Sequence, residues 1–138
     1  MKKDFEVEGV DHIGIVTDGS PNLFSLLKDV LGLSFLGTEK ISDQKTEVSV
    51  FRSGCNSSLE LLEPMSIDSV VARYREKNQK GIHHLALRVK GLELAIAYLV
   101  SKGIVMIDAK PRLGHGGSKI AFIHPRYTSG ILIELVEK

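Results

Sequence analysis

Two stretches of sequence decide the fold of this chain, Val10-Asp11-His12-Ile13-Gly14-Ile15-Val16 and Ile82-His83-His84-Leu85-Ala86-Leu87-Arg88. Both alternate apolar and polar residues, which predicts half-buried β-strands, and both carry a histidine at the third position. The later histidine, His84, follows the earlier one, His12, by 72 residues (84 − 12). Self-similarity at a fixed distance indicates an internal duplication.

A helical pattern follows each of these strands and ends at a glycine. Apolar residues recur with helical spacing over residues 23–31, before Gly32, and over residues 92–100, before Gly103. Glycine just after a helix readily adopts the left-handed conformation that closes the last turn. The two glycines are 71 residues apart (103 − 32). Ser20-Pro21 is predicted to begin the first helix, with serine as the N-cap.

Three further strands are predicted in each half, over residues 33–36, 47–52 and 58–62, and over residues 104–107, 119–124 and 131–136. The last strand of each half gives the best match, Leu59-Glu60-Leu61-Leu62-Glu63 against Ile133-Glu134-Leu135-Val136-Glu137. The first glutamates of these segments are 74 residues apart (134 − 60). Three landmarks therefore repeat in the same order at similar distances.

The repeat predicts an α+β fold in which two tandem βαβββ modules are related by pseudo-twofold symmetry. We expect a single domain over residues 1–138, with one module at about 8–64 and the other at about 81–137. The polar segment 65–80 would connect them and contain one short helix. With 43% hydrophobic residues, the chain can bury a core without disulfides.

Composition excludes several classes of function. Eighteen basic and 17 acidic residues give a net charge of +1 without a basic cluster, so nucleic acid and anionic membranes are not expected partners. The single cysteine, Cys55, permits no intrachain disulfide and suits a reducing compartment. Neither an apolar leader nor a stretch long enough to span a membrane is visible, so the expected location is the cytoplasm.

The duplicated histidine and glutamate are the candidates for chemistry. Equivalent residues of two modules converge near a pseudo-twofold axis, so His12, His84, Glu60 and Glu134 would face one point. Two imidazoles and two carboxylates suit divalent zinc, cobalt, nickel, manganese or iron, without deciding among them. A histidine in an apolar strand can also be a satisfied core residue, and a strand glutamate can lie on a solvent face. The duplication favours the metal site over these readings.

Other polar residues leave alternatives open. His83 must face the side opposite His84, because neighbouring strand residues point to opposite faces. The glycine turn that starts at Gly114 could present backbone N–H groups to an oxyanion, or could be a plain hairpin loop. His124, before Pro125, could line a site or cap the end of its strand.

Motifs along nearly the whole chain resemble those of the vicinal oxygen chelate superfamily and, within it, the methylmalonyl-CoA epimerases. These motifs are Asp11-His12-Ile13-Gly14-Ile15, Asp29-Val30-Leu31-Gly32-Leu33, Leu59-Glu60-Leu61-Leu62-Glu63-Pro64, Gly81-Ile82-His83-His84-Leu85-Ala86, Pro111-Arg112-Leu113-Gly114, Lys119-Ile120-Ala121-Phe122-Ile123-His124-Pro125 and Gly130-Ile131-Leu132-Ile133-Glu134-Leu135. The His124-Pro125 ending is closer to epimerases than to lactoylglutathione lyases, which usually have Asp-Pro there.

The resemblance implies a curved mixed sheet around one divalent metal held by His12, Glu60, His84 and Glu134. It implies an epimerase that moves the α-proton of an acyl-CoA thioester, with Glu134 as one proton-transfer group. Gly114, Lys119 and His124 are the expected substrate-binding residues. Related proteins are often homodimers, so a homodimer is expected.

The third strand departs from the epimerase pattern. Ser42-Asp43-Gln44-Lys45 replaces the usual Pro-Glu-Gln-Gly, and Ser49 stands where some epimerases carry a second catalytic glutamate. Glu47, two residues earlier and on the same strand face as Ser49, is the expected substitute. The alternatives are a lactoylglutathione lyase that acts on a glutathione conjugate, and a non-enzymatic resistance protein that sequesters a small molecule.

Overall fold

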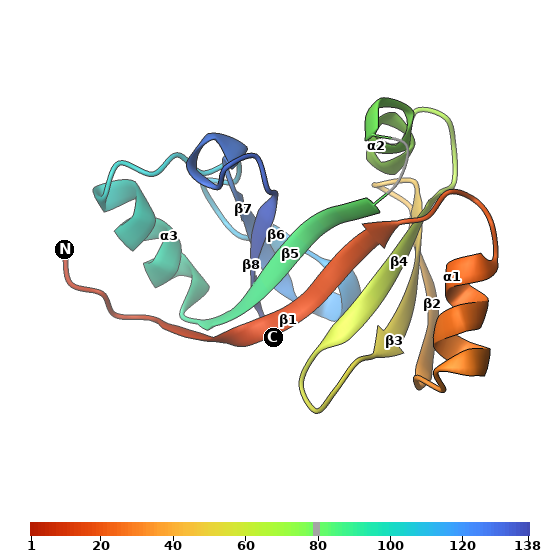
Figure 1. Ribbon diagram of the computed structural model, residues 1–138. Helices are drawn as coiled ribbons and strands as arrows, with labels where there is room; N and C mark the ends of the chain where they lie inside the picture. The colour runs from red at the N-terminus through yellow and green to blue at the C-terminus, as the bar shows by residue number, and fades with distance from the viewer. Residues whose placement is uncertain (79–80) are drawn as a thin grey trace. The chain divides into compact units, whose positions relative to one another are not determined.

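The computed structural model describes residues 1–78 and 81–138, which contribute eight strands to one mixed sheet in the order β2-β3-β4-β1-β5-β8-β7-β6 (Figure 1). The strands are β1 (Glu6–Val16), β2 (Phe35–Ile41), β3 (Thr46–Arg52), β4 (Ser58–Pro64), β5 (Gly81–Lys90), β6 (Arg112–Leu113), β7 (Lys119–Ile123) and β8 (Ile133–Glu137). The helices are α1 (Asn22–Ser25), which continues as a π-helical turn (Leu26–Val30), α2 (Val70–Asn78) and α3 (Leu92–Ser101).

The order β1-α1-β2-β3-β4 is repeated as β5-α3-β6-β7-β8, with α2 in the segment between them. This confirms the predicted α+β fold with two βαβββ modules. By its contacts the chain forms two compact units, which we call the middle unit (residues 12–83) and the terminal unit (residues 1–11 and 84–138). None of the described helices is long and apolar enough to cross a membrane.

In the middle unit, neighbouring residues of β4 enter two different hydrophobic clusters. Leu61 packs with Leu27 and Phe51 on the face covered by α1, whereas Leu62 packs with Val48 and with Val71 of α2. Side chains alternate between the faces of a strand. Glu60, two residues before Leu62, therefore belongs to the face of the Leu62 cluster.

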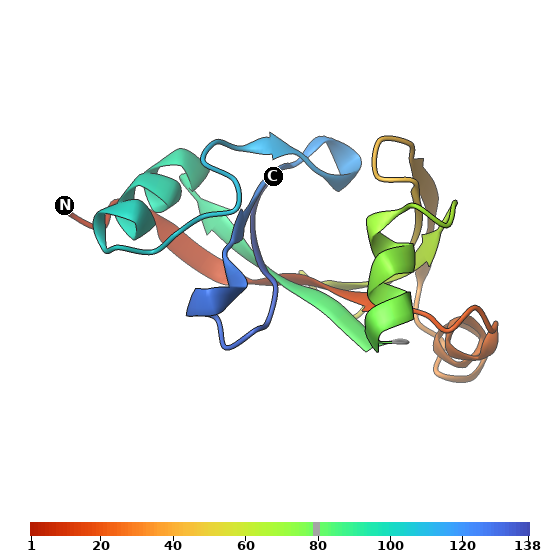
Figure 2. The same cartoon turned by 90° about the horizontal axis from the view of Figure 1, so that it is seen from above.

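The terminal unit is also packed on two faces. On one face, buried residues of α3 contact Val89, Ala121 and Leu135, and α3 lies beside the start of the chain in Figure 2. On the other face, Ala86 and Val136 are buried with Ile120. His84 and Glu134 precede Ala86 and Val136 by two residues each, so strand alternation places them on this second face.

Both predicted helix endings are confirmed, but the predicted beginning of the first helix is wrong. Gly32 and Gly103 have left-handed φ angles of 73° and 82°. The N-cap of α1 is Pro21, and no side chain caps this end of the helix. Ser20 instead donates its backbone N–H to the Asp18 carboxylate at 3.0 Å, because Asp18 closes a local turn before the helix.

Three of the further strands predicted in the two halves differ by two residues or more at their start, and one of these is β8, which begins at Ile133 instead of residue 131. β2 begins two residues later than predicted and continues to Ile41. The predicted strand over residues 104–107 is reduced to a single bridge, in which Met106 pairs with Ile123. The Asp108 carboxylate accepts a hydrogen bond from the Phe122 backbone N–H at 2.8 Å. This N–H is therefore not available to pair with the backbone of a longer strand beside β7. The edge strand β6 forms later, at Arg112–Leu113.

The connecting segment contains the predicted short helix, α2, while residues 79–80 at its end lie outside the described residues. Before α2, Asp68 accepts hydrogen bonds from Lys45 and Ser66, and these lower the pKa of its carboxyl to about 2 from 3.8. This lowering contributes to stability above pH 3.8, and the contribution is lost as the pH falls through about 2.

We expect Lys45→Met to return the pKa of Asp68 toward 3.8, because the hydrogen bond from Lys45 is the largest cause of the lowering. NMR titration of the Asp68 side-chain carbon in both proteins measures this pKa directly. An unchanged titration curve in Lys45→Met would contradict the assignment. Lys40→Met, at an exposed lysine of β2 in the same unit, is the control and should leave the pKa of Asp68 at about 2, because Lys40 is not among the groups that lower it.

Candidate metal centre

In the middle unit, the parallel strands β1 and β4 bring His12 and Glu60 together. Glu60 is the register partner of Gly14, which has no side chain to block the carboxylate from turning toward His12. His12 Nδ1 lies 3.5 Å from Glu60 Oε2. Both residues are buried, with exposed fractions of 6% each. The carboxylate is thus held against an imidazole in a region with little access to water.

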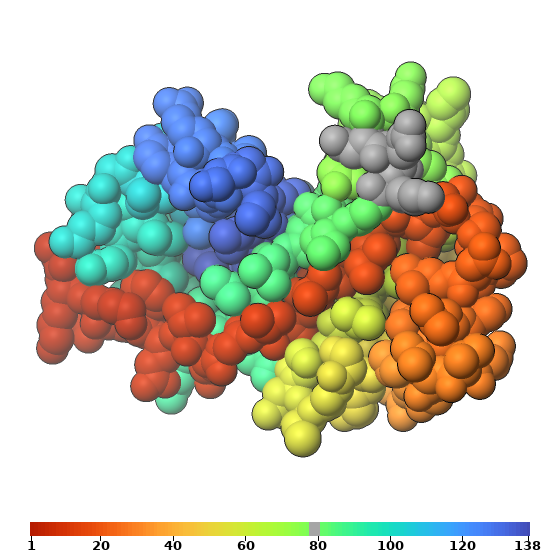
Figure 3. All heavy atoms as spheres, in the orientation of Figure 1, coloured from red at the N-terminus to blue at the C-terminus, as the bar shows by residue number. Residues whose placement is uncertain are grey.

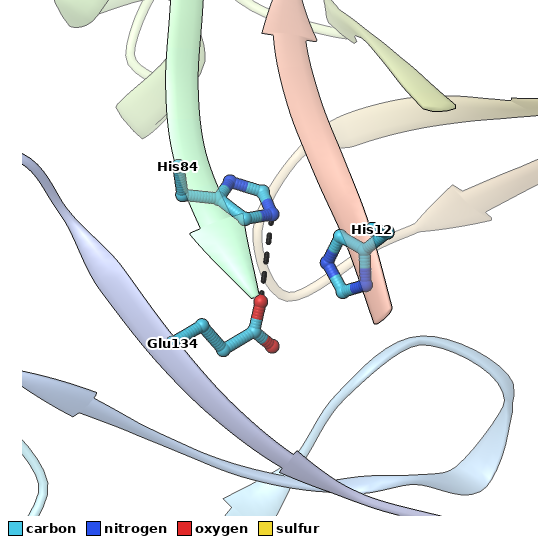
Figure 4. Close-up of side chains that lie close together, drawn as sticks. All are labelled: His12, His84 and Glu134. Atoms are coloured by element: carbon cyan, nitrogen blue, oxygen red, sulfur yellow. Dashed lines mark ion pairs between the residues drawn. The ribbon is translucent and has the colours of Figure 1, made fainter. Parts of the chain in front are cut away.

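In the terminal unit, the parallel strands β5 and β8 repeat this arrangement. Glu134 is the register partner of Ala86, the counterpart of Gly14 in the repeat, and Ala86 is also small. His84 Nε2 lies 3.4 Å from Glu134 Oε2, as the dashed line in Figure 4 shows. Both residues are buried. Each unit therefore builds one histidine–glutamate pair from equivalent positions.

The spacing within each pair suits a shared metal ion. At 3.4 and 3.5 Å the nitrogen and oxygen atoms are farther apart than in a charge-assisted hydrogen bond, which is about 2.7–2.9 Å. Two ligands bound tetrahedrally to one zinc ion, each at about 2.0–2.2 Å, would lie about 3.3–3.6 Å apart. One imidazole and one carboxylate per pair fit a divalent ion of the zinc, cobalt, nickel, manganese or iron group.

His83 faces different surroundings from its neighbour His84. Its ring lies 4.9 Å from the ring of Tyr74 in an edge-on arrangement. Burial lowers the pKa of the His83 imidazole and so favours its neutral form. The packing against Tyr74 gives His83 a structural role, and that only His84 of this pair belongs to the metal-binding set stays a prediction.

Glu47 lies on the strand face opposite Glu60. In the β3–β4 ladder, Glu60 pairs with Val50, while Glu47 pairs with Glu63. Because paired residues share a face and faces alternate along a strand, Glu47 and Glu60 point to opposite sides. Ser49 shares the face of Glu47, where its hydroxyl is 3.0 Å from that of Thr38. This placement does not favour Glu47 as a base beside a metal held by Glu60.

The three expected substrate-binding residues have different surroundings. Gly114 closes a turn by donating its N–H to the Ser118 carbonyl at 2.8 Å. Lys119 points away from the face of Glu134, because Phe122 is the register partner of Glu134 and Lys119 is three residues from it. His124 caps a short 3₁₀-helix (Pro125–Tyr127), since its Nδ1 accepts the Arg126 N–H at 3.1 Å. Of the two readings left open for His124, capping is the one observed.

We expect Gly114→Ala to destabilise the protein by about 1–3 kcal/mol, as overpacking in a closely packed region does. A Cβ added at Gly114 would lie 2.6 Å from Ile120 Cγ2 and 3.1 Å from the Ser118 hydroxyl. Urea denaturation measures the change. Gly116→Ala in the same turn is the comparison for backbone strain: a Cβ there meets nothing within 4 Å, so its cost comes from the left-handed φ of 67° and not from packing. Equal stability of wild type and Gly114→Ala would contradict the packing observed here.

Sequence reasoning missed a buried charged residue, Asp11. This residue is 1% exposed, and its Oδ1 accepts hydrogen bonds from Arg88 Nε at 2.8 Å and Arg88 Nη2 at 2.7 Å. Lys138 Nζ lies 3.1 Å from the same oxygen. An aspartate within an apolar strand is the signal that could have revealed it, because a buried carboxylate needs partners.

Comparison with known proteins decides the family. The family model for the glyoxalase/bleomycin resistance protein/dioxygenase superfamily matches residues 11–122. The chain belongs to this superfamily. The match confirms the membership that the motifs indicated.

Similar proteins include methylmalonyl-CoA epimerases. An uncharacterised protein of Bacillus subtilis (strain 168), YqjC, is 41% identical over 128 residues, which cover 93% of this chain and 91% of the relative. The structure of methylmalonyl-CoA epimerase from Mycobacterium tuberculosis is 33% identical with a TM-score of 0.89, over 99% of this chain and 92% of that chain. A variant of the Streptomyces coelicolor epimerase, in complex with 2-nitronate-propionyl-CoA, is 31% identical with a TM-score of 0.86, over 96% of each chain.

Proposed function

We propose that this protein is a divalent-metal-dependent epimerase that moves the α-proton of an acyl-CoA thioester of the methylmalonyl-CoA type. The observation that carries the proposal is the duplicated pair of buried histidine and glutamate, at 3.5 Å and 3.4 Å. The similarity to methylmalonyl-CoA epimerases supplies the reaction. That one similar epimerase binds a CoA compound supports the class of substrate.

In this proposal one metal ion takes His12, Glu60, His84 and Glu134 as ligands. Each half of the duplicated sequence contributes one imidazole and one carboxylate from equivalent strand positions. Three of these residues, His12, His84 and Glu134, form the candidate group of metal ligands found among the described residues (Figure 4). When bound, a divalent ion would act as a Lewis acid toward the thioester carbonyl group.

Glu134 is the proposed proton-transfer group. Glu134 is 4% exposed, and it lies on the same face as the buried side chains of Ile120 and Val136. A carboxylate in surroundings poor in water can remove the α-proton of a thioester and hold it for return. His84, 3.4 Å from Glu134, holds the carboxylate in place. The ring of Phe122, 6.1 Å from that of His84, adds to the apolar surroundings.

Hydrogen exchange in D₂O tests the proposal. The protein loaded with cobalt should replace the α-proton of methylmalonyl-CoA by deuterium, which ¹H NMR measures. We expect Glu134→Gln to reduce the rate by about 100-fold or more, as loss of a general base does. Glu47→Gln is the matched control and should retain the rate, because Glu47 points to the opposite face from Glu60.

Three outcomes would overturn the assignment. Absence of exchange with any of the five candidate metals would exclude the epimerase. Turnover of the methylglyoxal–glutathione hemithioacetal, with no exchange of the CoA thioester, would favour the lactoylglutathione lyase instead. Stoichiometric binding of a small toxic compound without metal would favour the sequestering function.

A further inference from the structure

The terminal unit contains a large pocket on the face that α3 covers. Its volume is about 1210 Å³, and it lies between α3 and the segment that leads to β6. Small-molecule sites typically measure roughly 300–1,000 Å³, so the pocket is large enough for an organic ligand. Its walls are apolar side chains, namely Ile96, Val100, Ile104, Val105, Met106 and Leu113. In Figure 3, α3 and the segment after it (cyan) lie at the surface.

The equivalent positions of the middle unit carry larger, aromatic side chains. There the rings of Phe24, Phe35 and Phe51 lie 5.1–5.2 Å from one another and close the layer between helix and edge strand. In the terminal unit the strand pairing puts Met106 against Ile123, where the middle unit pairs Phe35 with Phe51. Apolar walls left exposed cost stability, and Val100 and Leu113 are 55% and 74% exposed. A bound apolar group would remove this cost.

Three cations lie along one side of the pocket. Lys110 and Arg112 come from the edge segment, and Lys119 is the register partner of Leu113 on the neighbouring strand β7. Arg112 is already paired with Asp108 at 3.1 Å. Lys110 and Lys119 are exposed and form no ion pair within residues 1–78 and 81–138. Glu93 is the one acidic residue among the described residues that line the pocket, so the lining carries an excess of positive charge.

We propose that this pocket binds a fatty carboxylate, an anion with one charged group and a linear alkyl chain. The apolar walls would bury the alkyl chain, and removal of apolar surface from water favours binding. Lys110 and Lys119 would pair with the carboxylate. The metal ligands His84 and Glu134 lie on the other face of the sheet, so this site is separate from the proposed active site.

Titration calorimetry with decanoate, below the concentration at which it forms micelles, tests the proposal on the full-length protein. We expect saturable binding of one decanoate per chain. Decyltrimethylammonium, with the same chain and opposite charge, should not bind to saturation. Ala97→Trp places a ring in the pocket from an exposed position of α3, and it should weaken decanoate binding by at least about tenfold.

Charge variants complete the test. Lys110→Gln combined with Lys119→Gln should weaken decanoate binding by about three- to tenfold, as loss of exposed ion pairs does, and should leave decanol binding unchanged. Lys90→Gln is the matched control, an exposed lysine of the same unit that does not line the pocket.

Several results would overturn the proposal that the pocket binds a fatty carboxylate. These are the absence of saturable binding, equal binding to Ala97→Trp, and equal binding of the cationic analogue. Concentration-dependent dimerisation that decanoate leaves unchanged and Ala97→Trp abolishes would identify a second copy of the chain as the occupant instead. Competition between decanoate and coenzyme A would identify the nucleotide portion of the CoA substrate as the occupant of the pocket instead. All these measurements are independent of the exchange assay, so the failure of one proposal does not decide the other.

Discussion

His84→Ala is expected to bind cobalt at least about 100-fold more weakly than the wild type, because loss of a direct ligand costs no less than the 10–100-fold loss seen for residues that only support ligands. The imidazole that the substitution removes lies 3.4 Å from Glu134 and is 7% exposed. Alanine would leave the Glu134 carboxylate buried without this partner. The measurement is titration with cobalt, followed by the visible absorption of the bound ion and by elemental analysis after dialysis.

His83→Ala is the matched control for this experiment. It removes the same group from the adjacent position of the same strand, where the imidazole packs against Tyr74. We expect its metal content to equal that of the wild type, with a loss of stability that includes the missing ring contact with Tyr74. Equal metal content in the His84→Ala and wild-type proteins would show that the duplicated histidines are core residues. Metal should also raise the unfolding temperature of the wild type and of His83→Ala, but not that of His84→Ala.

The strands that carry the candidate ligands could be predicted because one short pattern occurs twice. His12 and His84 each come directly after a polar residue, within a strand that is otherwise largely apolar. Glu60 and Glu134 each lie between two apolar residues. The period of two along a strand then decides which residues share a face. Gly32 and Gly103 likewise determine where each helix ends, through a backbone conformation that other residues adopt at a cost.

The face of Glu47 could not be predicted, because it depends on the register between β3 and β4. Glu47 and Ser49 share one face of β3, but Phe51 on that face and Val48 on the other are both buried, so the pattern does not show which face is solvent-exposed. The turn before β3 includes Lys45 with a φ angle of 51°, which is unusual for a residue other than glycine. A shift of one residue in such a strand exchanges its faces. The sequence alone therefore could not place Glu47 relative to Glu60.

The ion-pair partners of Asp11 could not be predicted from the sequence, for a related reason. Arg88 lies 77 residues away along the chain (88 − 11), and Lys138 lies farther still. Neither position matches Asp11 in the repeat, since the counterpart of Asp11 is His83. The repeat therefore reveals residues that are used twice, as the candidate ligands are, but not an ion pair that occurs once.

Asp11→Ala is expected to destabilise the protein by about 2–4 kcal/mol, since hydrogen bonds to charged groups contribute about 1.5–3 kcal/mol and a broken buried pair leaves a charge without compensation. The carboxylate is 1% exposed, whereas the side chains of Arg88 and Lys138 are 26% and 55% exposed. Because Arg88 can still reach water, the expected cost is at the lower part of the range for buried pairs. Urea denaturation in the presence of a chelator measures the change without a contribution from bound metal.

Asp68→Ala is the matched control, because it removes an aspartate whose partner, Lys45, and whose own side chain are both exposed. Its unfolding midpoint should fall far less than that of Asp11→Ala, because exposed ion pairs contribute little to stability. The double variant Asp11→Ala, Arg88→Met completes a thermodynamic cycle that isolates the interaction between the two side chains. If the two substitutions are additive, the pair contributes no specific energy, and burial of Asp11 would then be a cost that other contacts of the terminal unit offset. A coupling energy above about 1.5 kcal/mol would instead show that Arg88 compensates the Asp11 charge, as the two hydrogen bonds at 2.7 and 2.8 Å indicate.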